Sequence, residues 1–346
     1  MVLRSYGFAA ALAVGLSIAA WTVAHQFDLP LRDPDSFAGP TYVRLPLIIV
    51  VAILIDVVPR AIARGWSAGG LRHSLVAVVR ERWPLRQVQM VLVGLGSWYL
   101  TYVAFRNLKS FVPFVRNGVD DGAVDSFDRI LLLGRDPADL LHDLLGTGVS
   151  AHVLSFFYLL WIVFVPFSLV VAIVWSRDIA IGSWYVTAVA VDWVLGVATY
   201  YLLPTLGPIY WEPAQYGDLP DTWVTSVQES LLSDRVAVIA NPYGTTAVQT
   251  IAAFASLHVG ILVTACVIAH LARLSAIVRW TLWAFLLITV VATVYLGWHY
   301  LADAFGGVAL GVVGAWLAAL GTGNAHRLRR APVDAVVEQQ EPALQA

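Results

Sequence analysis

Residues 151–175 read AHVLSFFYLLWIVFVPFSLVVAIVW, a run of 25 residues with no Asp, Glu, Lys or Arg. A helix of about 20 apolar residues crosses the ~30 Å hydrocarbon core of a bilayer, so this run predicts a transmembrane helix. Seven other stretches have a similar length and apolar character, approximately 6–24, 41–58, 87–105, 179–202, 252–271, 278–297 and 300–321. We therefore predict an all-α, polytopic membrane protein with about eight spans.

The composition supports this fold class independently of the spans. Hydrophobic residues make up 59% of the 346 residues and charged residues 13%, which is more apolar than the interior of a soluble globule can accommodate. A net charge of −2, with no basic face, excludes a nucleic-acid partner. The single cysteine, Cys266, excludes an intrachain disulfide and a thiolate metal cluster. Twenty arginines against one lysine are typical of a GC-rich bacterial genome.

The distribution of arginines predicts the orientation in the membrane. Cytoplasmic loops carry an excess of positive charge, and the arginines fall in alternate loops and the tail. These are Arg60, Arg64, Arg72, Arg80, Arg82, Arg86, Arg177, Arg273, Arg279, Arg327, Arg329 and Arg330. The other loops are acidic and include two long segments, 106–150 and 203–251. We expect a multi-pass plasma-membrane protein with both termini cytoplasmic and these two segments outside.

The spans divide the chain into three parts. Residues 1–86 form a two-helix addition with a basic cytoplasmic segment, and we expect its first span to be an uncleaved anchor. Residues 87–321 form a six-helix core, and residues 322–346 form a polar cytoplasmic tail that we expect to be disordered. Within the long outer loops, 125–145 has the spacing of short amphipathic helices. The segment 203–251, rich in Pro, Tyr, Trp and Gly, is expected to cap the bundle.

Two histidines and a carboxylate lie where apolar spans meet the outer side. His258 begins the sixth span, and His299 lies in the tight turn before the eighth. Asp303 follows His299 by four residues, which places both side chains on one helix face. A carboxylate at that distance fixes the imidazole tautomer and leaves the other nitrogen free to act as a nucleophile or base.

The residues around these histidines resemble two motifs of the type 2 phosphatidic acid phosphatase (PAP2) superfamily. Phe254-Ala255-Ser256-Leu257-His258 is similar to its Pro-Ser-Gly-His motif. Val294-Tyr295-Leu296-Gly297-Trp298-His299-Tyr300-Leu301-Ala302-Asp303-Ala304-Phe305-Gly306-Gly307 is similar to its third motif, and the resemblance covers roughly residues 87–320. It implies a phosphohistidine on His299, which Asp303 orients, while His258 protonates the leaving group and later activates the acceptor. It implies no metal and no cofactor.

The sequence also departs from the hydrolase pattern of this superfamily. Thr293 stands where the pattern has an arginine six residues before the nucleophilic histidine, and residues 200–211 contain no cation where a Lys/Arg-Pro motif is expected. The stretch Pro204-Thr205-Leu206-Gly207-Pro208-Ile209-Tyr210 resembles the branch of inositol phosphorylceramide and sphingomyelin synthases, which transfer a phospho-headgroup to an alcohol. These departures favour a transferase over a hydrolase.

Substitute cations are required, because phosphate charges in a dry site need partners. Arg106 and Lys109, just beyond the outer end of the third span, are the candidates for substrate binding, with Arg116 and Arg129 behind them. Ser256 is a further candidate, because a hydroxyl at a helix N-terminus can donate to phosphate oxygens. Asp192 lies too deep in its span for a role in this chemistry, and pairing with a hydroxyl of the bundle is its simplest explanation.

Three functions remain open at this point. The first is a phosphotransferase that moves a phospho-headgroup, phosphoinositol or a similar group, between a lipid donor and a hydroxyl acceptor. The second is a phosphatase of a phospholipid or polyprenyl phosphate with the same His/His/Asp site. The third is a transporter with a vestigial PAP2 core, which the absence of paired, broken short spans disfavours.

Overall fold

The computed structural model describes residues 2–34, 41–65, 70–176 and 178–328. In these ranges the chain is helical and forms no strand, which confirms the predicted all-α membrane fold. The elements are α1 (Val2–Gln26), α2 (Thr41–Gly65), α3 (Leu71–Arg82), α4 (Leu85–Val115), α5 (Asp121–Leu131), α6 (Pro137–Leu145), α7 (Val149–Val170), the π-helical turn η1 (Val171–Trp175), α8 (Ile179–Leu202), α9 (Pro208–Trp211), the 3-10 turn η2 (Pro213–Tyr216), α10 (Trp223–Ala240), α11 (Leu257–Leu271), α12 (Ala276–Tyr295), α13 (Leu301–Gly321) and α14 (Ala325–Leu328).

Seven helices are long and apolar enough to cross a membrane, counting α7 together with η1. They are α1, α2, α4, α7, α8, α12 and α13. The remaining predicted span, 252–271, which is the sixth along the chain, is helical only from Leu257 as α11, which makes it shorter than the others. Its first residues are not helical, because the backbone N–H groups of Ala253, Phe254 and Ala255 bind Thr205 and Thr199 instead. Non-helical backbone is tolerated there because protein, and not lipid, surrounds it.

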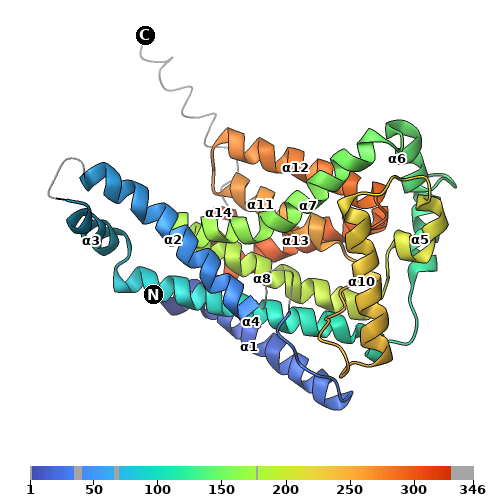
Figure 1. The fold of residues 1–346 in the computed structure, drawn as a ribbon, viewed down its shortest axis with the longest axis horizontal. Helices are drawn as coiled ribbons and strands as arrows, with labels where there is room; N and C mark the ends of the chain where they lie inside the picture. The colour runs from blue at the N-terminus through green and yellow to red at the C-terminus, as the bar shows by residue number, and fades with distance from the viewer. Residues whose placement is uncertain (1, 35–40, 66–69, 177, 329–346) are drawn as a thin grey trace, which may run out of the picture.

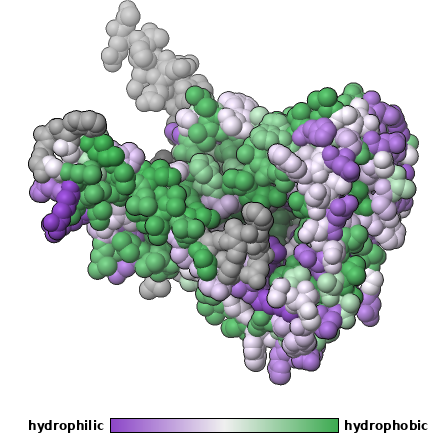
Figure 2. Space-filling model, viewed as in Figure 1, coloured by the Kyte–Doolittle hydropathy of each residue, from purple (hydrophilic) through white to green (hydrophobic). Residues whose placement is uncertain are grey.

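The helices of the two long loops gather at one end of the bundle (Figure 1), where α5, α6 and α10 lie together. The basic helix α3 lies at the opposite end, and α8 runs through the centre with most of its side chains buried. Figure 2 shows apolar surface over α2 and α7 and a more polar surface over the end formed by α5, α6 and α10. The predicted cap therefore covers one end of an otherwise apolar bundle.

Two predictions concern residues outside or at the edge of the described ranges. Arg177, Arg329 and Arg330, which were used to predict the orientation, lie outside the described residues. The same is true of the predicted tail from residue 329 onward, whereas residues 322–328 form a turn and α14.

Small residues let α11 approach α13 closely. A Cβ atom at Gly307 would lie 2.5 Å from the carbonyl oxygen of Ser256, and one at Gly311 would collide with the carbonyl oxygen of Gly260. Membrane helices commonly use such residues where their backbones touch. One turn deeper, the hydroxyl of Thr264 on α11 donates to the buried Asp192 of α8 at 2.7 Å, so Asp192 serves packing. The close approach at Gly307 and Gly311 holds the start of α11 against α13.

Replacing Gly311 with valine should separate these two helices. Overpacking a close contact costs about 1–3 kcal/mol, so we expect Gly311→Val to lower the apparent melting temperature in detergent, followed by circular dichroism. Gly96→Ala on α4 is the matched control, because an added Cβ there meets no atom within 4 Å. Equal melting temperatures for the two variants would contradict the close α11–α13 contact.

Candidate active site

The turn between α12 and α13 presents His299. Gly297 has a φ of 73°, and a side chain there would also meet the ring of Tyr216, with 2.7 Å between the added Cβ and the ring. The N–H groups of Trp298 and His299 both bind the carbonyl oxygen of Thr293, at 2.9 and 3.2 Å. Thr293, which replaces the arginine of the hydrolase pattern, is fully buried and fixes this turn through its backbone. The backbone of Gly297 and the backbone hydrogen bonds to Thr293 therefore fix the position of His299.

Asp303 holds one nitrogen of the His299 ring. Its Oδ2 lies 3.0 Å from His299 Nδ1 and also accepts the backbone N–H of Tyr300 at 3.0 Å. The backbone carbonyl of Asp303 accepts the N–H of Ser256 at 3.0 Å, which ties α13 to the start of α11. The predicted spacing thus brings the carboxylate and the imidazole into contact, and it leaves Nε2 directed away from Asp303.

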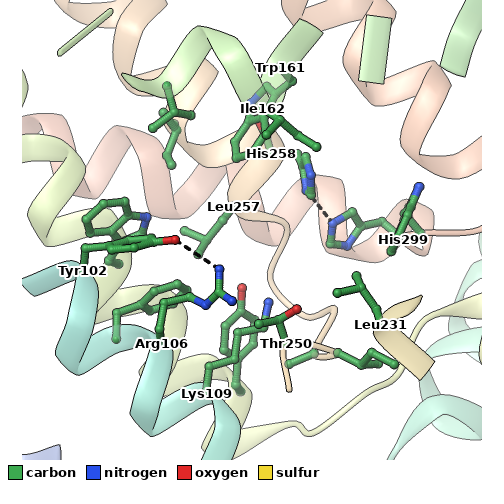
Figure 3. Close-up of a pocket in the computed structure, with 18 of the residues that line it drawn as sticks. Tyr102, Arg106, Lys109, Trp161, Ile162, Leu231, Thr250, Leu257, His258 and His299 are labelled. Atoms are coloured by element: carbon green, nitrogen blue, oxygen red, sulfur yellow. Dashed lines mark hydrogen bonds between the residues drawn. The ribbon is translucent and has the colours of Figure 1, made fainter. Parts of the chain in front are cut away.

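His258 meets the free nitrogen of His299. The distance from His258 Nδ1 to His299 Nε2 is 3.0 Å, and Figure 3 shows the two rings facing each other across the bond. The His258 ring lies 4.1 Å from the ring of Trp161 and 5.1 Å from that of Tyr158, measured between centroids. Trp161 Nε1 also donates to the backbone carbonyl of His258 at 3.0 Å. Aromatic side chains of α7 therefore hold the second histidine in place.

The surroundings of His299 favour its neutral form. Burial, and then the positive charge of Lys109, lower the pKa of His299 to about 3. An imidazole whose pKa lies this low is uncharged at neutral pH, and its Nε2 carries a lone pair when the Nδ1 proton is bound by Asp303. This is the protonation state that nucleophilic attack requires.

Both histidines line a cavity of about 410 Å³, and so do Arg106 and Lys109. The two cations come from α4, and Figure 3 shows them on the opposite side of the cavity from the histidines. Arg106 Nη1 donates to the hydroxyl of Tyr102 at 3.1 Å, and Lys109 Nζ lies 4.7 Å from the centre of the Tyr200 ring. An anion bound in the cavity would lie between the cations and His299.

Three other predicted residues lie elsewhere. Ser256 is fully buried, does not line the cavity, and uses its hydroxyl to cap α11 by accepting the N–H of Val259 at 3.4 Å. The role of Ser256 in binding phosphate stays a prediction, and in the structure its hydroxyl oxygen caps the helix end. Arg116 pairs with Asp120 at 4.0 Å, and Arg129 pairs with a cluster of acids, Asp125, Asp136 and Glu212. Their charges are compensated away from the cavity wall.

Sequence reasoning missed two buried carboxylates on α5. Asp128 accepts the N–H groups of Leu301 and, at 2.8 Å, of Ala302, so it caps the N-terminus of α13 from another helix. Asp121 accepts the N–H groups of Leu206 and Gly207 at 2.9 Å and the hydroxyl of Tyr300 at 3.0 Å. These contacts join partners more than 80 residues apart, and the amphipathic pattern of α5 gives no signal for them.

Comparison with protein families gave one match. Residues 124–317 match the family model described as the PAP2 superfamily. This range covers more than half of the chain and contains both histidines and Asp303, whereas Arg106 and Lys109 precede it. No curated protein and no solved structure matched the chain.

The cap that Asp128 provides should make the site sensitive to pH. Burial, and then the nearby carboxylates of Asp303 and Asp136, raise the pKa of Asp128 to about 6, while its bonds to Ala302 and Leu301 oppose this. Asp128 therefore gains a proton as the pH falls through about 6 and then accepts the two N–H groups less well. We expect the turnover of a phosphate ester such as para-nitrophenyl phosphate to fall between pH 7 and 5, and Asp128→Asn to show a low turnover without this step.

Stability should respond in the opposite sense. The pKa of Asp128 in the folded protein lies above that of an unfolded aspartate, about 3.9, so protonation favours the folded state as the pH falls through 6. Between pH 7 and 5, protonation of Asp128 should therefore lower the turnover without lowering the apparent melting temperature. Parallel pH profiles for the wild type and Asp128→Asn would contradict this role.

Proposed function

The chain belongs to the PAP2 superfamily, and from this we propose a membrane phosphotransferase that moves a phospho-headgroup from a lipid donor to a hydroxyl acceptor. Membership supports phosphatase or phosphotransferase chemistry in general. The observation that carries the proposal is the line of contacts from Asp303 through His299 to His258, each 3.0 Å long, at the wall of a cavity that also contains two cations.

The geometry supports a two-step transfer. His299 Nε2 attacks the phosphorus, the bond from phosphorus to the leaving oxygen breaks, and His258 gives that oxygen a proton. In the second step the acceptor hydroxyl gives its proton to His258, its oxygen attacks the phosphohistidine, and His299 is released. Asp303 keeps the Nδ1 proton in place and stabilises the charge on the ring. The phosphoryl group enters between His258 and His299, so their 3.0 Å contact opens when substrate binds.

The free hydrogen-bonding capacity of the cavity suits an anion. Arg106 Nε and Trp298 Nε1 are buried N–H donors on cavity-lining residues, without a hydrogen-bond partner among the described residues. Both are donors, and together with the charge of Lys109 they match a ligand that has acceptor oxygens and negative charge. In this proposal α4 supplies the phosphate-binding charges that the hydrolase pattern places elsewhere.

The proposal favours transfer over hydrolysis on two grounds. Thr293 replaces the phosphate-binding arginine of the hydrolase pattern, and the stretch 204–210 resembles the synthase branch, whose members include phosphoinositol transferases. The alternative is a phosphatase of a phospholipid or polyprenyl phosphate. The same three residues favour it, because water fits at His258 as readily as an alcohol does.

We also propose that the reaction takes place at the outer face of a bacterial plasma membrane. The turn that contains His299 contacts the helices of the end where α5, α6 and α10 gather, because Asp128 of α5 accepts the N–H of Ala302 and Gln228 of α10 donates to the carbonyl oxygen of Leu296. Helix α3, with Arg72, Arg80 and Arg82, lies at the other end of the bundle (Figure 1). Positive charge is retained on the cytoplasmic side, so this arrangement supports the proposed orientation with α3 and both termini inside.

Replacing His299 should abolish covalent labelling. We expect wild-type protein incubated with radiolabelled phospholipid or polyprenyl-phosphate donors to form an acid-labile phosphoryl adduct, and His299→Ala to form none. Label that moves to an added alcohol supports the transferase, and a burst of inorganic phosphate without an acceptor supports the phosphatase. Equal labelling of wild type and His299→Ala would overturn the mechanism. The transporter alternative predicts that His299→Ala keeps the transport activity of the wild type.

Removing either cation of α4 should weaken substrate capture. A hydrogen bond to a charged group contributes about 1.5–3 kcal/mol, so Arg106→Ala and Lys109→Ala should each lower kcat/KM by roughly tenfold to a hundredfold. Arg116→Ala is the matched control, because Arg116 pairs with Asp120 and does not line the cavity. The same kcat/KM for Arg106→Ala and Arg116→Ala would contradict the assignment.

A further inference from the structure

The cavity has two chemically different ends. The histidines and the cations of α4 occupy the polar end. Next to them the wall has an apolar limb, formed by Ile48 of α2, Trp98 of α4, and Ile162, Val165 and Pro166 of α7. The limb begins at Ile162, which Figure 3 shows beside His258, and at Trp98, whose ring stacks on Tyr102. A second cavity of about 20 Å³ shares Ile48, Trp98 and Pro166 with this limb. It is lined otherwise only by apolar side chains, Ile49, Leu95, Leu169, Val170, Ile173 and Val174.

The apolar limb reaches the lipid-facing side of the bundle. Ile48 is 39% exposed and Ile162 is 47% exposed, although both side chains also line the cavity. The outer faces of α2 and α7 beside them are apolar, as Figure 2 shows. The limb therefore lies between the catalytic histidines and the surface that contacts lipid chains.

We propose that the apolar limb between α2, α4 and α7 holds a hydrocarbon chain of the substrate lipid while its phosphate lies at the histidines. This inference rests on the proposed function. Burial of hydrocarbon is favourable wherever the wall offers no competing polar groups, and the limb contributes only one, the N–H of Trp98. Because the second apolar cavity continues the limb beyond Ile48, Trp98 and Pro166, the chain of a bound lipid can extend from the phosphate along this path.

The walls of the apolar limb come from two parts of the sequence. Both histidines lie inside the matched range 124–317, but α2 and α4 precede it. The walls that select the chain are therefore built jointly by α7, within the family match, and by two helices outside it. Chain selectivity in this protein then depends on residues such as Ile48 and Trp98, which the family match does not cover.

The proposal is tested by varying the length of the alkyl chain of the substrate. The full-length protein in detergent is incubated with radiolabelled butyl phosphate or dodecyl phosphate, and the half-saturation concentration for phosphorylation of His299 is measured. Eight additional methylene groups should lower it at least roughly tenfold, allowing for partition into micelles. Ile162→Trp and Val165→Phe, which add bulk to the limb, should reduce this advantage to less than about threefold.

Val163→Trp is the matched control. Val163 is adjacent to Ile162 on α7, is 61% exposed, and does not line the cavity, so the advantage of dodecyl phosphate should persist in this variant. If wild type labels equally well with both phosphates, or if Val163→Trp loses the advantage as Ile162→Trp does, the chain site is overturned while the chemistry stands.

A failure of the chemistry itself is recognised separately. If neither phosphate labels the wild type, the affinity of each phosphate for His299→Ala is measured from the quenching of tryptophan fluorescence. The chain site is supported, independently of the proposed function, if dodecyl phosphate binds His299→Ala at least roughly tenfold more tightly than butyl phosphate does. Adding Ile162→Trp should then remove this difference in affinity. Equal affinities overturn the chain site.

Discussion

Asp303 forms hydrogen bonds with both segments that contain the histidines, the turn at His299 and the residues just before His258. Its side chain binds His299 and the backbone N–H of Tyr300, and its backbone carbonyl binds the N–H of Ser256, two residues before His258. This arrangement requires the start of α11 to lie close against α13, and the missing side chains of Gly307 and Gly311 leave room for this. The distance between the two histidines therefore follows from helix packing as much as from their own hydrogen bond.

Buried carboxylates complete this arrangement from outside the two helices. A charge removed from water is costly unless hydrogen bonds replace the lost solvation. Asp128 meets this condition with the first N–H groups of α13, and Asp121 does so with the N–H groups of Leu206 and Gly207 and the hydroxyl of Tyr300. The outer helix α5 thus connects three segments around His299, and the cap over the bundle contributes directly to the geometry of the site.

Several features could be predicted from sequence because they depend on local periodicity. The spans follow from apolar runs, and the contact between His299 and Asp303 follows from a spacing of four residues in a helix. Other features depend on tertiary contacts that periodicity does not encode. Residues 252–256 are mostly apolar, and their sequence predicts part of a span, but Thr199 and Thr205 bind their backbone and keep them out of the helix. The capping role of Asp128 depends on a helix 173 residues away in sequence, so only the fold shows it.

The location of the phosphate-binding charges gives these observations a common interpretation. A dry site that handles phosphate needs positive charge, yet Thr293 and residues 200–211 lack the expected cations. Arg106 and Lys109 reach the same cavity from α4, a helix that precedes the matched range. The same helix contributes Trp98 to the apolar limb, so one element supplies both the charge for the headgroup and a wall for the chain. Because α4 holds both groups in a fixed relation, a change in its packing would alter headgroup binding and chain selection together, while the contact between the histidines and Asp303 would persist.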